Sequence, residues 1–384
     1  MNNRYEQLDS LRGLAALFVV FHHLFLSFSS NHFLVTFLKL SPARLLVQGH
    51  AAVIIFFLLS GFVLALPILR GNPINYMHYI IKRFCRIYIP YAVAISATIL
   101  ISIYISDGQL QQYTDFINQS WQEPFSFSLM WEHLVLIGNP HTVVYNPVIW
   151  TLIHELRISI LFPFIVLLVK KLNTIYVLIL CAALSLIAGL AGILSTITVN
   201  GYHTSLFDSL HYISIFMIGA LVAKNKTVLS TLYQRFTKMQ KISFLIMAVL
   251  LYSYSDVLSK DFFHIIPFRF YVSEYGLALG SVLLIIMALA SRKISGLLNL
   301  PLLKFLGKIS YSLYLTHMLV ILSLLHLLHD RISMPLLLTL SGLVSILTAI
   351  ICWYFVELPS MKLGKYLTKS RKNSVPSLEV RQEA

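Results

Sequence analysis

The chain has 384 residues, of which 58% are hydrophobic and only 11% are charged, and its mean hydropathy is +0.79. Soluble domains carry about 25% charged residues, so this composition excludes an ordinary soluble fold and indicates a polytopic membrane protein. The formal net charge of +14 is compatible with nucleic-acid binding, but the placement of the charges favours another interpretation.

Ten apolar stretches are long enough to cross a membrane as helices. We therefore predict an all-α, polytopic helical bundle with both termini in the cytoplasm. Residues 1–366 would form one membrane domain, and residues 367–384 a polar, disordered tail. The predicted spans are 8–29, 45–69, 87–106, 146–169, 174–198, 206–223, 241–255, 271–290, 305–328 and 334–356.

The distribution of Lys and Arg supports this topology. With the N-terminus inside, 22 of the 29 cationic residues fall on inner segments, counting Lys241 and Lys308 at the inner ends of their spans, and five fall on outer segments, while Arg12 and Arg157 are counted within spans. This asymmetry is the positive-inside pattern of a cytoplasmic-membrane protein. The excess positive charge therefore indicates the orientation of the chain in the membrane, and nucleic acid is not an expected partner.

The first predicted span, 8–29, carries an arginine and two adjacent histidines. Arg12 and His23 are eleven residues apart, which is about three helical turns, so both side chains share one face. Ionisable side chains inside a membrane usually line a polar interior, and an imidazole is suited to take a proton from a hydroxyl. His23, expected near mid-bilayer, is the first catalytic candidate, with a packing role as the alternative.

The fourth predicted span places a carboxylate at a similar depth. Thr151 and Glu155 lie on one polar stripe, and Trp150 precedes them. Glu155 is expected to orient His23 or to bind an acceptor hydroxyl. An ion pair with Arg157 of the same helix is disfavoured, because the two side chains point about 200° apart.

The ninth predicted span, 305–328, places Ser310, Tyr314 and His317 on one face at spacings of four and three residues. Hydrogen bonding between helices is the simpler interpretation for Ser310 and Tyr314. It explains His317 less well, since a buried imidazole is costly.

Two further segments point to the cytoplasmic side. Arg83 and Arg86 are i, i+3 neighbours, and arginine forks match phosphate oxygens well, although anionic lipid head groups would attract them equally. Ser60 and Gly61 indicate either close helix packing or a narrow ligand passage. The three cysteines have no metal or disulfide spacing, and no metal is expected.

The longest predicted loop, 107–145, contains no Lys or Arg but four carboxylates and two tryptophans, Trp121 and Trp131. Acidic groups with tryptophans can line a sugar-binding mouth. Anchoring of the tryptophans at the membrane interface is the alternative.

The motifs LDSLRGLAALFVVFHH, FFLLSGF, KRFCRIYIP, WTLIHEL, GKISYSLYLTH and VELP, in this order, resemble the membrane acyltransferase 3 family over residues 5 to 360. The resemblance implies that Arg12 and His23 form the family's Arg-X10-His pattern and that Arg83 and Arg86 form its Arg-X-X-Arg pattern on the acyl-CoA side. It also places Trp150 and Glu155 in a tryptophan–glutamate element in which Thr151 replaces the usual serine, and makes His317 the terminal histidine of the family's last motif.

From the residues and the resemblance together we expect a membrane O-acyltransferase, foremost an O-acetyltransferase, with acetyl-CoA or another acyl-CoA as donor and a sugar hydroxyl as acceptor. The acceptor would be an extracytoplasmic or lipid-linked surface glycan such as lipopolysaccharide, and the enzyme would lie in the cell inner membrane. His23 would be the general base, with Arg12, Arg83, Arg86 and Ser60 on the donor side.

Two other function classes fit parts of the pattern. A secondary transporter exporting a glycan or a lipid intermediate would also align charges within a bundle, but no inverted repeat is visible in the sequence. A channel or receptor with a structural polar core is a third, weaker interpretation. Release of free CoA from acetyl-CoA would separate the enzyme from both.

Overall fold

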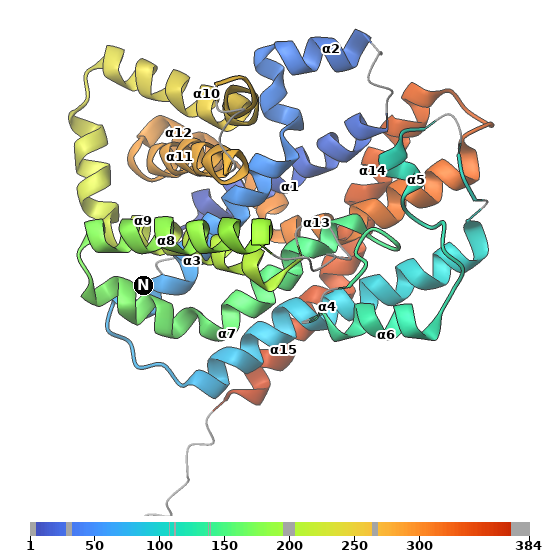
Figure 1. The fold of residues 1–384 in the computed structure, drawn as a ribbon, viewed down its shortest axis with the longest axis horizontal. Helices are drawn as coiled ribbons and strands as arrows, with labels where there is room; N and C mark the ends of the chain where they lie inside the picture. Colours follow the sequence, from blue (N-terminus) through green and yellow to red (C-terminus); the bar gives the residue numbers. More distant parts are fainter. Residues whose placement is uncertain are drawn as a thin grey trace, which may run out of the picture.

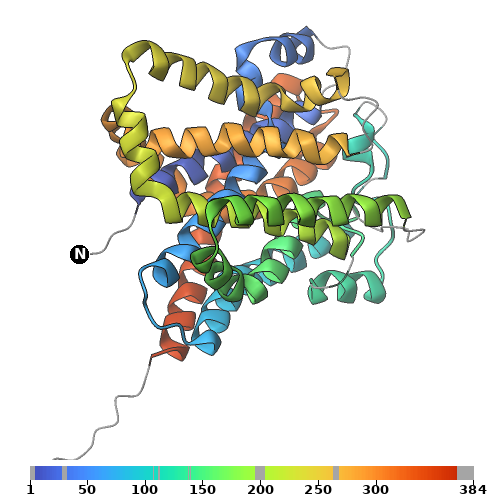
Figure 2. The same ribbon diagram turned by 60° about the vertical axis from the view of Figure 1, so that its left-hand side comes forward.

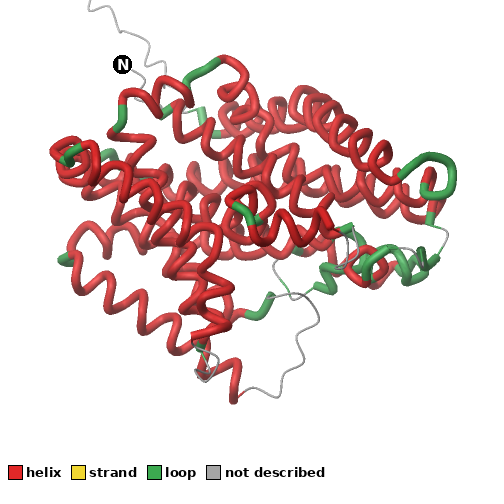
Figure 3. Tube along the Cα trace, turned by 90° about the horizontal axis from the view of Figure 1, so that it is seen from above, coloured by secondary structure: helices red, strands yellow, loops and turns green. Residues whose placement is uncertain are grey.

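The computed structural model describes residues 5–27, 33–106, 108–110, 113–136, 138, 140–194, 204–262 and 268–369. Every regular element in these ranges is helical, as Figure 3 shows. Within them, ten helices are long and apolar enough to cross a membrane, and they match the ten predicted spans one to one. The predicted tail from 367 and the ends of the spans 8–29 and 174–198 fall partly outside the described residues.

The first nine long helices are α1 (Glu6–Leu26), α3 (Gly49–Leu69), α4 (Tyr76–Ile105), α7 (Trp150–Lys171), α8 (Thr174–Leu194), α9 (Leu206–Arg235), α10 (Lys238–Phe262), α11 (Arg269–Ala290) and α13 (Pro301–Leu328). The last consists of α14 (Met334–Cys352), a π-helical turn (Trp353–Glu357) and α15 (Leu358–Leu367). Shorter elements are α2 (Phe33–Leu40), α5 (Asp115–Asn118), α6 (Phe127–Val135), α12 (Arg292–Leu298) and 3₁₀ turns at Pro42–Val47 and Pro147–Ile149.

The helices α1, α3 and α13 occupy the interior of the bundle. Helices α10, α11 and α12 lie on one side of them, and α4, α6 and α15 lie on the opposite side (Figure 1). Figure 2 shows that α8, α10 and α11 lie in separate rows and run in roughly the same direction across the view. The second, sixth and ninth spans, α3, α9 and α13, are the most buried of the ten, with 72% of their most apolar stretch inside the protein, against 50% for α1.

The interior pair α1 and α13 is parallel, as contacts at two levels show. Near the start of both helices, Lys304 forms an ion pair with Glu6 at 3.0 Å. One level further, Gly13 and Gly307 bring the two backbones together, since a Cβ on Gly13 would lie 2.5 Å from the Gly307 nitrogen. Small residues permit this approach, which fixes the register that brings the later turns of the helices face to face.

The third span begins earlier than hydropathy predicts. The sequence places it at 87–106, whereas α4 starts at Tyr76, where the Asn75 side chain accepts a hydrogen bond from the His78 backbone N–H. Its first turns contain Lys and Arg, which lower the mean hydropathy, so a hydropathy average does not detect them. The capping interaction nevertheless starts the helix at this point. Arg83 and Arg86 consequently lie within the helix rather than in a segment before it.

Candidate active site

The two histidines predicted on the first and ninth spans meet. His317 Nε2 lies 3.1 Å from His23 Nδ1, and the ring centroids are 5.0 Å apart. His317 is fully buried, whereas His23 is half-buried and lies in the last turn of α1. The parallel register of α1 and α13 thus joins residues 294 positions apart in the chain.

Hydrogen bonds to backbone carbonyls determine which nitrogen of each ring carries the proton. His317 Nδ1 lies 3.1 Å from the Leu313 carbonyl oxygen, and His23 Nδ1 lies 2.9 Å from the Val19 carbonyl oxygen. A carbonyl only accepts, so each neutral ring is protonated at Nδ1. His317 Nε2 can then only accept, from His23 Nδ1–H. This leaves a lone pair on His23 Nε2, which has no hydrogen-bond partner among the described residues.

Aromatic and hydroxyl groups surround the histidine pair. Phe116 of α5 stacks on His23 with centroids 5.5 Å apart, and Tyr314 lies one turn before His317. The Tyr314 hydroxyl is 2.8 Å from Thr151 Oγ1, so the first turn of α7 is linked to α13 beside the pair. The structure therefore places Tyr314 and Thr151 beside the histidine pair.

Glu155 lies with cationic and hydroxyl groups rather than with His23. Its carboxylate forms an ion pair with Arg83 at 2.8 Å and accepts from Ser60 Oγ at 3.4 Å. Arg83 also donates to Ser159 Oγ, at 2.8 and 3.1 Å. Three predicted residues from α3, α4 and α7 thus form one network, in which Glu155 is 20% exposed and Arg83 10% exposed at the side chain.

Two other guanidinium groups near this network, those of Arg12 and Arg86, form no hydrogen bond or ion pair with a described residue. Arg12 interacts electrostatically with Arg86, Asp9 and Glu155, but forms no hydrogen bond or ion pair with any described residue. Arg86 is exposed and likewise has no such partner in the described ranges. The buried Glu357, which accepts from Ser312 Oγ at 2.6 Å, interacts with both at longer range. These cations can bind an anionic group from outside the protein.

Some predicted lining residues lie elsewhere. Ser310 donates to the Gly307 carbonyl of its own helix at 3.0 Å and joins no network. In the outer loop, Trp121 is 3% exposed, packs on His326 and donates to the Tyr145 carbonyl, so it offers no face to a sugar. Trp131 is 66% exposed, which fits the anchoring alternative.

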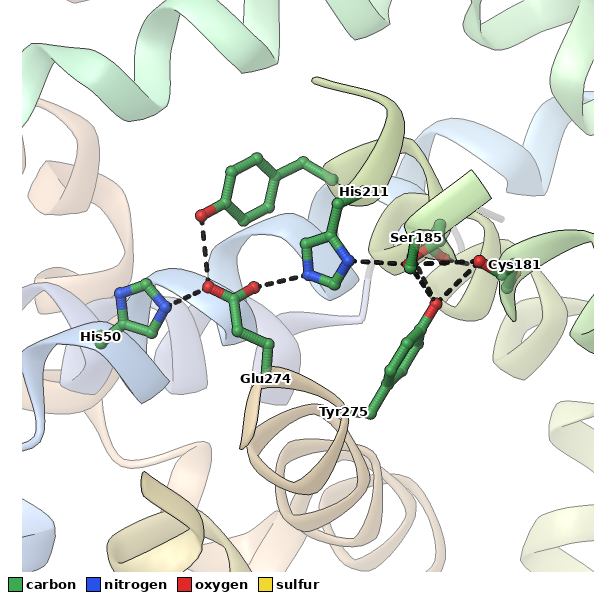
Figure 4. A network of polar contacts seen from close by, with 8 residues as sticks. His50, Cys181, Ser185, His211, Glu274 and Tyr275 are labelled. Atoms are coloured by element: carbon green, nitrogen blue, oxygen red, sulfur yellow. Dashed lines mark hydrogen bonds and ion pairs between the residues drawn. The ribbon is translucent and has the colours of Figure 1, made fainter. Parts of the chain in front are cut away.

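A second polar cluster, which sequence reasoning did not identify as a site, lies beside Trp150 (Figure 4). Its centre is Glu274 of α11, 1% exposed, which is bonded to His50 of α3 and to His211 of α9. The signal was available: Glu274 and His211 both fall inside predicted spans, and the rule that identified His23 applies to them equally. Trp150 stacks on His50 with centroids 6.0 Å apart, so this predicted residue faces the second cluster.

Comparison with known proteins identifies the family of the chain. A family model described as an acyltransferase domain, acyltransferase 3, matches residues 5–355. The chain is similar to "Putative acetyltransferase ORF330" of Acidianus two-tailed virus, with 26% identity over 328 residues, which is 83% of this chain and 84% of the viral protein. No solved structure matches the chain significantly.

The family match spans α1 to the π-helical turn, and therefore includes every helix that contributes to the histidine pair and to the Glu155 network. Acyl transfer, rather than export or conduction, is the activity that this match carries. With ten helices in its described residues that are long and apolar enough to cross a membrane, the chain belongs to the acyltransferase 3 family and is a multi-pass membrane acyltransferase.

Proposed function

We propose that the protein transfers an acyl group, acetyl in the first instance, from cytoplasmic acyl-CoA to a sugar hydroxyl. The acceptor is an extracytoplasmic or lipid-linked surface glycan, and the enzyme works in the cell inner membrane. His23 is the general base. The observation that supports this proposal is the lone pair on His23 Nε2, which follows from the contact with His317 and has no hydrogen-bond partner among the described residues.

The chemistry needs one base that can also return its proton. The acceptor hydroxyl gives its proton to His23 Nε2 while its oxygen attacks the thioester carbonyl carbon. The C–S bond then breaks, and the CoA thiolate takes the proton back from the imidazolium. His317 Nε2 accepts from His23 Nδ1–H throughout, so it holds the ring in the productive tautomer and stabilises the positive charge.

The guanidinium groups of Arg12 and Arg86, which have no hydrogen-bond partner among the described residues, support the proposed acyl-CoA donor. Arg86 and Arg12 are free to bind the phosphates of CoA or to place the thioester, and Arg12 lies on the same helix as His23. Arg83 and Ser60 serve the donor differently, since both are bonded to Glu155 and hold the wall between α3, α4 and α7. Glu155 accordingly acts as a positioning residue in this wall.

The test is His23→Ala in purified protein supplied with radiolabelled acetyl-CoA and a panel of methyl glycosides as acceptors. A general base contributes about 10²–10⁴-fold, so acetyl transfer is expected to fall by that factor. Membrane insertion and the detergent-solubilised melting temperature are expected to stay near those of the wild type.

His329→Ala is the matched control, because His329 is a half-buried histidine at the far end of α13. It is expected to keep full activity. A fully active His23→Ala protein would refute the role of His23, and a wild type that releases no CoA in the presence of any glycoside would refute the proposed donor and acceptor classes.

A further inference from the structure

The second polar cluster is built around a buried carboxylate with unusual partners. Glu274 is contacted by His50 Nε2, by His211 Nε2 at 2.8 Å and by the Tyr212 hydroxyl at 3.2 Å (Figure 4). No Lys or Arg of the described residues pairs with it. A buried carboxylate is costly unless it is bonded, and packing alone would be served by apolar residues of the same size. Packing alone therefore does not explain this cluster, which indicates a functional role.

One end of the cluster is closed. His211 is fully buried, and its Nδ1 lies 2.8 Å from Ser185 Oγ. That hydroxyl lies 2.6 Å from the Tyr275 hydroxyl and 3.2 Å from the Cys181 carbonyl. All polar atoms at this end have partners within the protein, so nothing further can bind there.

The other end is open. His50 uses Nε2 on Glu274, and its Nδ1 has no hydrogen-bond partner among the described residues. The His50 side chain is 24% exposed, against 1% for Glu274 and His211. The buried groups thus fix one ring whose Nδ1, among the described residues, is left without a partner and is available to a ligand.

This open end adjoins the histidine pair. Gly49, the residue before His50, packs against the ring of His22, since a Cβ on Gly49 would lie within 2.9 Å of three His22 side-chain atoms. The His22 and His23 rings are in edge contact, with centroids 5.2 Å apart. The His22 ring and the Gly49 backbone therefore connect the helix turns that carry His50 and His23.

We propose that His50 Nδ1 binds a hydroxyl of the acceptor, separate from the hydroxyl that is acylated, and so makes His50 a determinant of acceptor specificity. This rests on the proposed function, since it assigns the acceptor subsite of that reaction. The ligand class is an uncharged polyol. A hydroxyl both donates and accepts, so it satisfies Nδ1 whether the ring is neutral or protonated, and it does not disturb the charge of Glu274.

The test compares His50→Asn with His50→Gln. Asn places a polar atom where Nδ1 stands but does not reach Glu274, whereas Gln reaches Glu274 and offers nothing at the Nδ1 position. The methyl glycoside best used by the wild type is the probe. His50→Gln is expected to raise the KM for this glycoside about tenfold, the effect of one lost hydrogen bond, and to leave the KM for acetyl-CoA unchanged. His50→Asn is expected to keep more of the glycoside affinity.

The opposite ranking, with Gln tolerated and Asn impaired, would show that His50 only satisfies Glu274 and would overturn the subsite. Equal KM values for the glycoside in wild type and both variants would overturn it as well, while leaving the proposed function intact. His329→Gln is the control and is expected to change neither KM, because His329 pairs with Asp330 away from both clusters. A wild type inactive on every glycoside removes the subsite together with the proposed function.

Discussion

Two arginines three residues apart on α4 have different environments, although sequence treats them as one motif. Arg83 faces α7, is buried and is bonded to Glu155 and Ser159. Arg86 lies most of a turn further along, is exposed and has no hydrogen bond to a described residue. A spacing of three residues turns a helix by about 300°, which suffices to direct one guanidinium into the wall and the other into open space.

Replacing each arginine should therefore have different effects. Arg83→Ala leaves Glu155 without its cation, and breaking a buried pair costs about 3–5 kcal/mol; because the pair here is partly exposed, the lower end is expected. The melting temperature in detergent should fall clearly. Arg86→Ala should keep the melting temperature and, if Arg86 binds the CoA phosphates as proposed, raise the KM for acetyl-CoA by the loss of a charge-assisted bond.

Thermal unfolding and steady-state kinetics on the two variants separate these outcomes. Arg86→Lys is the control that keeps the charge and loses the fork, and an intermediate KM is expected for it. Equal loss of stability in the Arg83 and Arg86 variants would contradict the division described here.

Among the helices, α3 and α9 show the closest packing, and the glycines of both make it possible. A Cβ on Gly61 would collide with the Phe216 backbone carbonyl, and a Cβ on Gly219 would collide with the Leu58 carbonyl. Of the two sequence interpretations of Ser60–Gly61, the glycine fits close helix packing, while the serine beside it contacts Glu155. This packing holds His50 and His211, which lie near the starts of the two helices, at a fixed separation.

Gly61→Ala should consequently destabilise the protein, although alanine is favoured over glycine in a helix by about 1 kcal/mol. The added methyl group meets rigid backbone, so α3 and α9 must separate. Gly296→Ala is the matched control, since nothing lies within 4 Å of the position of its Cβ, and it should be neutral or slightly stabilising. The measurement is the melting temperature of both variants in the same detergent. Equal values for Gly61→Ala and Gly296→Ala would contradict the close contact of α3 with α9.

At the scale of the whole molecule, helix contacts agree with an alternating ten-span order. The first and ninth spans, α1 and α13, are parallel, as two odd-numbered spans must be. The third and fourth, α4 and α7, are antiparallel: Tyr76 of α4 donates to the Ile160 carbonyl at 3.0 Å, while Arg83, further along α4, bonds Glu155, earlier in α7.

The proposed orientation, with both termini in the cytoplasm, predicts the result of labelling with a membrane-impermeant maleimide. In a variant whose three cysteines are replaced by serine, Gln109→Cys in the exposed outer loop should react in intact cells. Lys369→Cys, exposed after α15, should react only after the membrane is broken. Labelling of Lys369→Cys in intact cells would reverse the assigned sides and, with them, the cytoplasmic donor.

The sequence by itself determined the all-α class and the number of spans, and it singled out His23 and His317, which meet in space. It could do so because apolar length and helical phase are local properties that survive folding. The family resemblance added the kind of reaction, which no periodicity reveals.

Tertiary structure alone decided which groups are engaged and which are free. Glu155 and His23 share a polar character in the sequence, yet the first is bonded to Arg83 and the second is paired with His317. The His50–Glu274–His211 cluster joins α3, α9 and α11, and no single helix carries its pattern. Register and crossing between helices are set by non-local packing, such as the glycine contacts of α1 with α13 and of α3 with α9, and these contacts have no signature within one span.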